Sequence, residues 1–355
     1  MPTAGGGVLN GLPPGSSGGV AGRGAPVFGW YTQTLTDYVL VGGAIFIAMF
    51  LSHRVLRLLG VGREAATGYA LILPWLIGLV VWTIGPFIAS FYLSFTDYTI
   101  LRSPEWIGAD NYVEMFTGDP RFWEVLRFTL GYSIINVPLG LVGALMTATL
   151  LNQDVKGLGI WRTLFYLPAV LPAAATALLW RWMLASDGLI NQMFSPVYSL
   201  VGVERPSWLT NPDMVLPAYI LMGLWGVFGA NTIILLAGLK NIPRDLYDAA
   251  KIDGAGRWSI YLNVTLPMLS STLFYVLIIG IIASLQTFTQ AFFIQHTARA
   301  GTFMGVYIYE EAFQRNNMGY ASALGWIMLI IILCFTLLVF KSSSAWVYYE
   351  GERAK

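Results

Sequence analysis

Long stretches without charged residues alternate with short charged segments along this chain. The charge-free runs cover residues 38–53, 65–96, 128–153, 163–180, 214–239, 258–298 and 316–340. An α-helix needs about 20 predominantly apolar residues to cross the hydrocarbon layer of a bilayer, and five of the runs clearly exceed that length. The pattern therefore predicts seven spanning helices near residues 36–54, 69–94, 125–151, 160–185, 215–238, 268–294 and 320–342. The first is the weakest, because its charge-free run of 16 residues is marginal.

Lysine and arginine are distributed unequally between the two sets of connecting segments. If the segment 53–67 is cytoplasmic, the inner segments hold twelve of these residues and the outer loops hold five. Cytoplasmic loops carry an excess of Lys and Arg. The bias predicts an outer N-terminus and a cytoplasmic C-terminus. If 38–53 does not cross, the N-terminus is inside and the other six helices keep their orientation.

Composition supports an all-α membrane protein. Apolar residues make up 56% of the chain and charged residues 11%, against about 25% charged in a typical soluble domain. Residues 1–35 are rich in Gly, Pro and Ser and are expected to be a disordered tail. We expect an additional transmembrane helix over 36–58, a six-helix core over 65–345 and a short cytoplasmic tail over 346–355.

Several classes of site are disfavoured by what the chain contains. The net charge of +1 shows no excess of basic residues of the kind that binds nucleic acid. Cys334 is the single cysteine, and the two histidines, His53 and His296, are far apart, so we expect no metal site. The phosphate-binding pattern GxxxxGK[ST] and the GxSxG pattern are both absent from the sequence. We therefore expect no catalytic residues and no ATPase activity by that route.

The segment 239–267 interrupts the apolar pattern with seven charges in 29 residues. Pro243 is suited to the first position of a helix, and Gly254 can end that helix in a left-handed conformation. A second short helix is predicted from about Arg257 to Thr265, stopped by Pro267. Leu246, Ala249 and Ala250 share one face of the first helix, and the two alanines leave room for another surface to approach closely.

The string IPRDLYDAAKIDGAGRWSIYLNVTLP, residues 242–267, resembles the cytoplasmic signature loop of binding-protein-dependent ABC transporter permeases. In that family Glu-Ala-Ala is followed by a gap of two, Asp-Gly-Ala and a hydrophobic stretch ending in Leu-Pro. Asp248 stands where the family usually has Glu, which keeps the charge and shortens its reach. SFTDYTI (94–100), RTLFYLPAVLP (162–172) and WVYYEGE (346–352) extend the resemblance to carbohydrate permeases of the maltose and glycerol-phosphate type.

This resemblance implies the six-helix core of a type I ABC importer permease in a prokaryotic inner membrane. It also implies that the loop is a coupling helix seated in a cleft of an ATPase. The coupling residues expected on that basis are Leu246, Tyr247, Asp248, Ala249, Ala250, Asp253, Gly254 and Ala255. The implied partners are a second, similar permease, two ATPase subunits and an extracytoplasmic solute-binding protein. ATP and Mg²⁺ would bind the ATPase, and this chain would hold no cofactor.

Uncharged polar and aromatic residues lie in the two spans that flank the loop, and by resemblance these spans line the substrate cavity. The candidate pathway residues are Trp225, Phe228, Asn231, Ser284, Gln286, Phe288 and Gln290. Such groups suit the hydroxyls and C–H faces of a sugar, although they could instead form interhelical hydrogen bonds. The chain could also be an importer for glycerol phosphate or another small polar solute, or an ion-coupled secondary transporter. The last function is disfavoured because the inner parts of the spans contain no carboxylate or histidine.

The acidic pair Glu310–Glu311 lies in a predicted outer loop. We expect it to be solvated, although it could instead contact the binding protein.

Overall fold

The computed structural model describes residues 25–153, 157–294 and 301–348, with side chains from residue 35 onward except that of Val227. Within these ranges the chain is helical apart from two short antiparallel strands, in which Thr96 pairs with Trp106. The elements are α1 (Ala25–Leu58), α2 (Arg63–Leu79), a π-turn (Val80–Ile84), α3 (Gly85–Leu93), β1 (Thr96–Asp97), β2 (Glu105–Trp106), α4 (Asp110–Val113), a π-turn (Glu114–Gly118), α5 (Pro120–Leu151), α6 (Leu158–Val170), α7 (Ala173–Met183), α8 (Leu189–Val201), α9 (Pro212–Lys240), α10 (Arg244–Ile252), α11 (Arg257–Ile260), a π-turn (Tyr261–Thr265), α12 (Leu266–Leu285), α13 (Thr289–Phe293), α14 (Met304–Tyr309), a π-turn (Glu310–Gln314) and α15 (Met318–Ser343).

The first of two compact units comprises Met1–Phe87. Its helices α1 and α2 are joined by only four residues, and such a short connection makes them antiparallel neighbours. The buried residues of α2 are Ala66 and Ala70, one turn apart, and small side chains at this spacing let two membrane helices approach closely.

This unit differs from the predicted domain boundaries in two ways. Helix α1 begins at Ala25, so residues 25–35 are helical and do not belong to the predicted tail. Pro26, in the first turn, is compatible with a helix start because the N–H groups there have no intrahelical partner. The compact division also places residues 65–87 with the additional helix, whereas the prediction assigned them to the core. Residues 1–24 and 349–355 lie outside the described residues.

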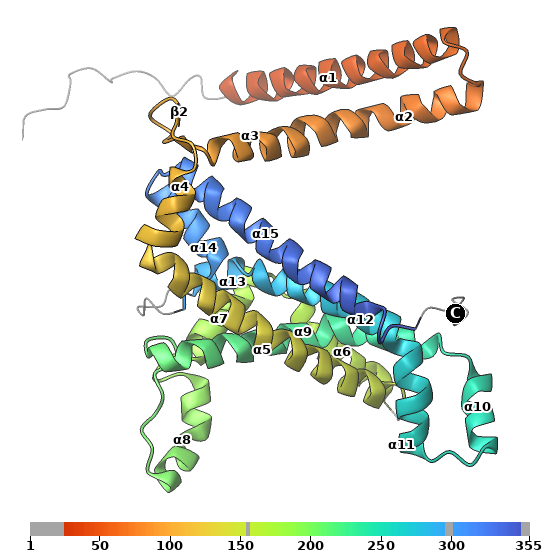
Figure 1. Ribbon diagram of the computed structural model, residues 1–355, viewed down its shortest axis with the longest axis vertical. Coiled ribbons are helices and arrows are strands. Elements are labelled where there is room, and N and C mark those ends of the chain that lie inside the picture. The colour runs from red at the N-terminus through yellow and green to blue at the C-terminus, as the bar shows by residue number, and fades with distance from the viewer. Residues whose placement is uncertain (1–24, 154–156, 295–300, 349–355) are drawn as a thin grey trace, which may run out of the picture. The chain divides into compact units, whose positions relative to one another are not determined.

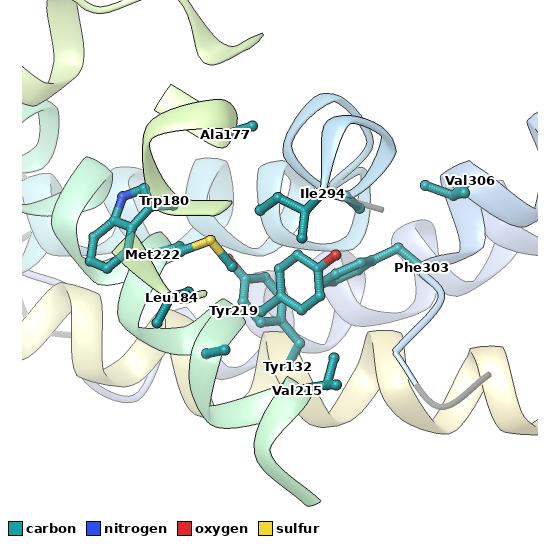
Figure 2. Close-up of a cluster of buried hydrophobic side chains, with 12 residues drawn as sticks. Tyr132, Ala177, Trp180, Leu184, Val215, Tyr219, Met222, Ile294, Phe303 and Val306 are labelled. Atoms are coloured by element: carbon teal, nitrogen blue, oxygen red, sulfur yellow. The ribbon is translucent and has the colours of Figure 1, made fainter. Parts of the chain in front are cut away.

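The second unit, Ile88–Lys355, is organised around α5, which packs against α9 and α12 (Figure 1). Helix α15 packs on α12, α6 on α9, and α13 on α7. Figure 2 shows one buried cluster of this unit, in which the rings of Tyr132 and Tyr219 meet that of Phe303 at centroid distances of 5.0 and 4.9 Å. Helices α10 and α11 protrude at one end of α5, and α8 lies near the other end (Figure 1).

Helices long and apolar enough to cross a membrane occur at every predicted span. Five are single candidate spans, one of which has a short break after Leu285, and two further spans are bent pairs of segments, which makes up to seven in the described residues. The predicted span 160–185 is broken by 97° between α6 and α7. Pro172 has no N–H to donate and disfavours a helical conformation at Leu171, whose ψ is 137°. Helix α9 bends by 44° between Pro212–Gly226 and Phe228–Lys240.

The predicted stop at Pro267 is wrong. Helix α11, the π-turn Tyr261–Thr265 and α12 continue without a break from Arg257 to Leu285, within the candidate span Arg257–Phe293. In the π-turn the N–H of Leu266 donates to the carbonyl of Tyr261, five residues back. A π-turn contains one residue more than an α-helical turn. Pro267 therefore falls in the first turn of α12, where a residue without an N–H group is tolerated.

A polar network joins the starts of α5 and α15 to α14. The carboxylate of Asp119 caps α5 by accepting a hydrogen bond from the Arg121 N–H at 2.9 Å. It also accepts hydrogen bonds from the hydroxyls of Tyr307 and of Tyr320, the latter at 2.6 Å. The guanidinium of Arg121 lies over the Tyr307 ring, 4.6 Å from its centroid, and pairs with Glu310.

The acidic pair Glu310–Glu311 is therefore not a solvated loop. The Glu311 side chain is buried and accepts from Arg315 at 2.6 Å. Burial raises the pKa of the Glu311 carboxyl, and the positive charges of Arg315 and Arg121 oppose only part of that effect. Burial also acts to raise the pKa of Asp119, but the hydrogen bonds from Tyr307, Tyr320 and two backbone amides outweigh it, and the net pKa is below its ordinary value.

Replacing Asp119 with Asn should lower the melting temperature of the purified protein. Hydrogen bonds to a charged group contribute about 1.5–3 kcal/mol, and we expect the lower end because Asp119 is half-buried. A lowered pKa stabilises the fold above the ordinary value of 3.8 and ceases to do so as pH falls through the folded-state pKa. The wild type should therefore lose this contribution in acid, and Asp119→Asn should not. Asp97→Asn, an exposed carboxylate in β1, is the control; equal melting temperatures for all three proteins would refute the role of Asp119.

Candidate functional site

A cavity of about 280 Å³ opens between α5, α9 and α12 in the interior of the second unit. The polar side chains lining it are Tyr132, Asn136, Asn231, Ser284, Thr287 and Gln290. The remaining lining residues are aliphatic or glycine, and none of the residues around this cavity carries a formal charge. The site can thus donate and accept several hydrogen bonds without offering an ionic partner.

Asn136 and Gly223 define the wall between α5 and α9. Asn136 is buried, and its Oδ1 has no hydrogen-bond partner in the structure. A buried acceptor without a partner is costly, which is typical of a group that binds something else. Gly223 makes the close approach possible, because a Cβ there would lie 2.3 Å from Tyr132 Oη and 2.6 Å from Asn136 Oδ1.

The third wall of the cavity is a break in the span formed by α12 and α13. Helix α12 ends at Leu285, and Phe288 has φ −132° and ψ −62°, outside the helical region. The hydroxyl of Thr287 donates to the Ser284 carbonyl at 2.8 Å and so satisfies one group released by the break. Interrupted helices at membrane depth are tolerated where they line a cavity, and in transporters they commonly form the substrate site.

Three of the seven predicted pathway residues, Asn231, Ser284 and Gln290, line this cavity, and the other four do not. Trp225 packs edge-to-face on Trp180, with ring centroids 5.7 Å apart, against the buried cluster that contains Tyr132 and Tyr219. Phe228 lies against Gly143, where an added Cβ would meet its ring. Gln286 is exposed at the end of α12, and Phe288 stacks on Phe292 at 5.3 Å. The alternation of aromatic and polar residues therefore does not by itself indicate which side chains face this cavity.

Tyr132, Asn136 and Thr287 also line the cavity, although they are not among the seven candidate pathway residues. Tyr132 and Asn136 belong to α5, which does not flank the charged loop. They are four residues apart and lie one turn apart on the same face of the helix. A polar side chain within a charge-free run distinguishes Asn136 in the sequence, and the one-turn spacing then points to Tyr132.

The predicted coupling segment forms a helix, α10, that ends as expected at Gly254. Its φ is +78°, in the left-handed region that glycine adopts without strain. The N–H of Gly254 donates to Lys251 O at 3.0 Å and the N–H of Ala255 to Ala250 O at 2.9 Å. This pair of hydrogen bonds is the Schellman motif, which satisfies the last carbonyls of the helix.

Helix α10 presents an exposed surface and one anchor. Leu246, Asp248, Ala249, Asp253 and Gly254 are exposed, while Ala250 and Ala255 are half-buried. Asp248 forms an exposed ion pair with Lys251 at 2.9 Å.

The half-buried Tyr247 packs against the apolar cluster of α5, α9 and α12, and its hydroxyl lies 3.3 Å from Thr265 Oγ1. The neighbouring Ile252, Trp258 and Leu262 are exposed by 87%, 78% and 54%. Tyr247 therefore attaches α10 to the helical body, and the apolar side chains around it are available to another surface.

Comparison with known proteins agrees with these features. The family described as binding-protein-dependent transport system inner membrane component matches residues 136–345. The chain is 41% identical to the probable ABC transporter permease protein YesP of Bacillus subtilis, over 82% of this chain and 94% of the relative. It is 31% identical to the trehalose/maltose transport system permease protein MalF of Thermococcus litoralis, over 79% and 94%. A bacterial ABC transporter involved in import of the acidic polysaccharide alginate has a similar structure, with a TM-score of 0.68, 25% identity and coverage of 78% and 94%.

Replacing Gly223 with Ala should destabilise the protein. The new methyl group would overlap Tyr132 and Asn136, and overpacking of this kind costs about 1–3 kcal/mol. Gly226→Ala is the matched control, because Gly226 lines the same cavity on the same helix and its Cβ would meet no atom within 4 Å. We expect a lower melting temperature for Gly223→Ala alone. Equal melting temperatures would show that α5 and α9 are not as close as the structure has them.

Proposed function

Because this chain belongs to the family of inner membrane components of binding-protein-dependent transport systems, we propose that its cavity is half of the pathway for a neutral sugar or oligosaccharide. The chain is a multi-pass permease subunit of an ABC importer. The main support for this proposal is that six uncharged side chains capable of hydrogen bonding line one cavity.

The chemistry of these side chains favours a polyhydroxylated, uncharged solute. A sugar hydroxyl both donates and accepts, and so do the amide and hydroxyl side chains of the cavity. A phosphorylated polyol or an acidic polysaccharide would need a cationic partner when desolvated, and the residues around the cavity provide none. The similar proteins are named for trehalose/maltose and for alginate, and this lining fits the first kind of solute better.

Helix α10 is the proposed contact with an ATPase. Its exposed Leu246 and Ala249 and the nearby Trp258 form an apolar surface on a protruding element (Figure 1). ATP and Mg²⁺ would bind that separate subunit, present in two copies. A second, similar permease would complete the pathway, and a solute-binding protein would deliver the sugar from outside. The excess of Lys and Arg near α10 supports a cytoplasmic location for α10 and for the C-terminus.

Replacing Asn136 or Asn231 with Leu should reduce uptake of the transported sugar while the complex still assembles. Each change removes a cavity group that hydrogen-bonds the solute, at a cost of about 1–3 kcal/mol, or roughly 5- to 150-fold in affinity. Uptake into vesicles at limiting sugar concentration measures the effect. Thr149→Val serves as control, because Thr149 is on the same helix as Asn136, donates its hydroxyl hydrogen bond to Leu145 O of that helix and does not line the cavity. Normal uptake by both Leu variants would place the solute elsewhere.

Replacing Ala250 with Glu should prevent productive contact with the ATPase without affecting membrane insertion. The half-buried alanine has room for a close neighbour, and an added carboxylate would be desolvated on docking. ATP hydrolysis stimulated by the binding protein should fall at least tenfold in the purified complex. Gln153→Glu, which adds the same carboxylate at an exposed position after α5, should leave hydrolysis unchanged. If the two variants behave alike, α10 is not the contact.

A further inference from the structure

A second cavity of about 280 Å³ lies between α6 and α9, apart from the solute cavity. Its lining residues come from α6 and α9, together with Leu151 at the end of α5. None of them lines the first cavity. The proposed sugar pathway therefore does not account for this space.

The lining combines an apolar wall with two positive charges. Phe165, Ile233 and Leu236 represent the wall, while Arg162 and Lys240 supply the charges. No carboxylate lines the cavity, and neither cation forms an ion pair with a described residue. The Nε of Arg162 is buried and has no hydrogen-bond partner in the structure. An unpaired donor on a guanidinium is costly unless an anion satisfies it.

Both cations lie at the same end of the two helices. Arg162 is in the first turns of α6, and Lys240 is the last residue of α9, just before α10. This end is the cytoplasmic one by the distribution of Lys and Arg. The apolar wall extends from the charges toward the middle of the span, where Gly229 approaches the carbonyl of Phe165 so closely that a Cβ would lie 2.7 Å from it. The charges are thus at headgroup depth and the wall is at acyl-chain depth.

We propose that this cavity binds an anionic phospholipid of the inner leaflet, with its phosphate between Arg162 and Lys240 and one acyl chain along the wall. Basic pockets between membrane helices on the cytoplasmic side are suited to anionic headgroups. Exposed apolar residues of α6, such as Ile160 and Leu164, place the helix beside lipid, which gives a lipid molecule access. Free phosphate would satisfy the charges but would leave the apolar wall unoccupied.

The test compares two lipids that share acyl chains and differ in headgroup charge. The complete transporter is placed in nanodiscs containing phosphatidylglycerol and phosphatidylcholine, extracted gently, and its retained lipids are counted by native mass spectrometry. Wild type should retain phosphatidylglycerol preferentially. Each neutralised cation should weaken that preference about fivefold, so Arg162→Gln/Lys240→Gln should lose it almost completely. Excess inorganic phosphate should not displace the lipid.

Two further variants make the result decisive. Arg162→Lys/Lys240→Arg keeps both charges and should keep the preference, which separates loss of charge from loss of folding. Lys341→Gln removes an exposed cation at the end of α15 that is not part of this cavity, and it should behave as wild type. The proposal is overturned if the double Gln variant retains phosphatidylglycerol as wild type does, if Lys341→Gln loses as much, or if phosphate displaces the lipid.

Discussion

The hydrocarbon layer offers no hydrogen-bond partner to an exposed N–H or C=O group, and the rest of this structure depends on that constraint. A spanning segment must satisfy its backbone internally, which is why the described spans are helices. Where a spanning helix is interrupted, the freed N–H and C=O groups must find hydrogen-bond partners nearby or be buried within the protein. The π-turn before Pro267 is a local repair, since the Leu266 N–H finds an acceptor five residues back. The break after Leu285 is instead placed against a cavity lined by polar side chains.

The same constraint explains how a polar pathway can exist inside an apolar bundle. Close packing of α5 against α9 depends on glycines, and Gly223 brings the backbone of α9 against Tyr132 and Asn136. Small residues exclude lipid from this contact, so the amide of Asn136 is withdrawn from hydrocarbon without being fully hydrogen-bonded. A solute hydroxyl can complete its hydrogen bonding. A buried acceptor without a partner in the protein is therefore well placed to bind a solute.

The spans and the charged loop could be located from the sequence because both depend on local chemistry. A charge-free apolar run of about 20 residues favours a membrane span, and glycine after an amphipathic turn favours the left-handed helix end found at Gly254. The sequence does not indicate side-chain positions that depend on tertiary contacts. Trp225 and Phe228 lie on α9 with Asn231, yet one packs on Trp180 and the other on Gly143. Glu311 looked like a loop residue, but Arg315 one turn later allows it to be buried. Pro267 does not end the helix because the π-turn before it contains one additional residue, and the presence of proline alone does not reveal that turn.

Helix α12 connects the proposed ATPase contact at α10 with the proposed solute cavity. Tyr247 of α10 lies beside Thr265, immediately before α12, and packs with the apolar cluster that holds α12 to α9. Helix α12 then runs without interruption to Ser284, where it lines the cavity and breaks. A displacement of α10 would therefore be carried by a rigid helix of about 30 Å (20 residues at 1.5 Å each) to the point where the backbone is no longer helical. The break at Gln286–Phe288 thus lies at the far end of a helix whose near end contacts α10.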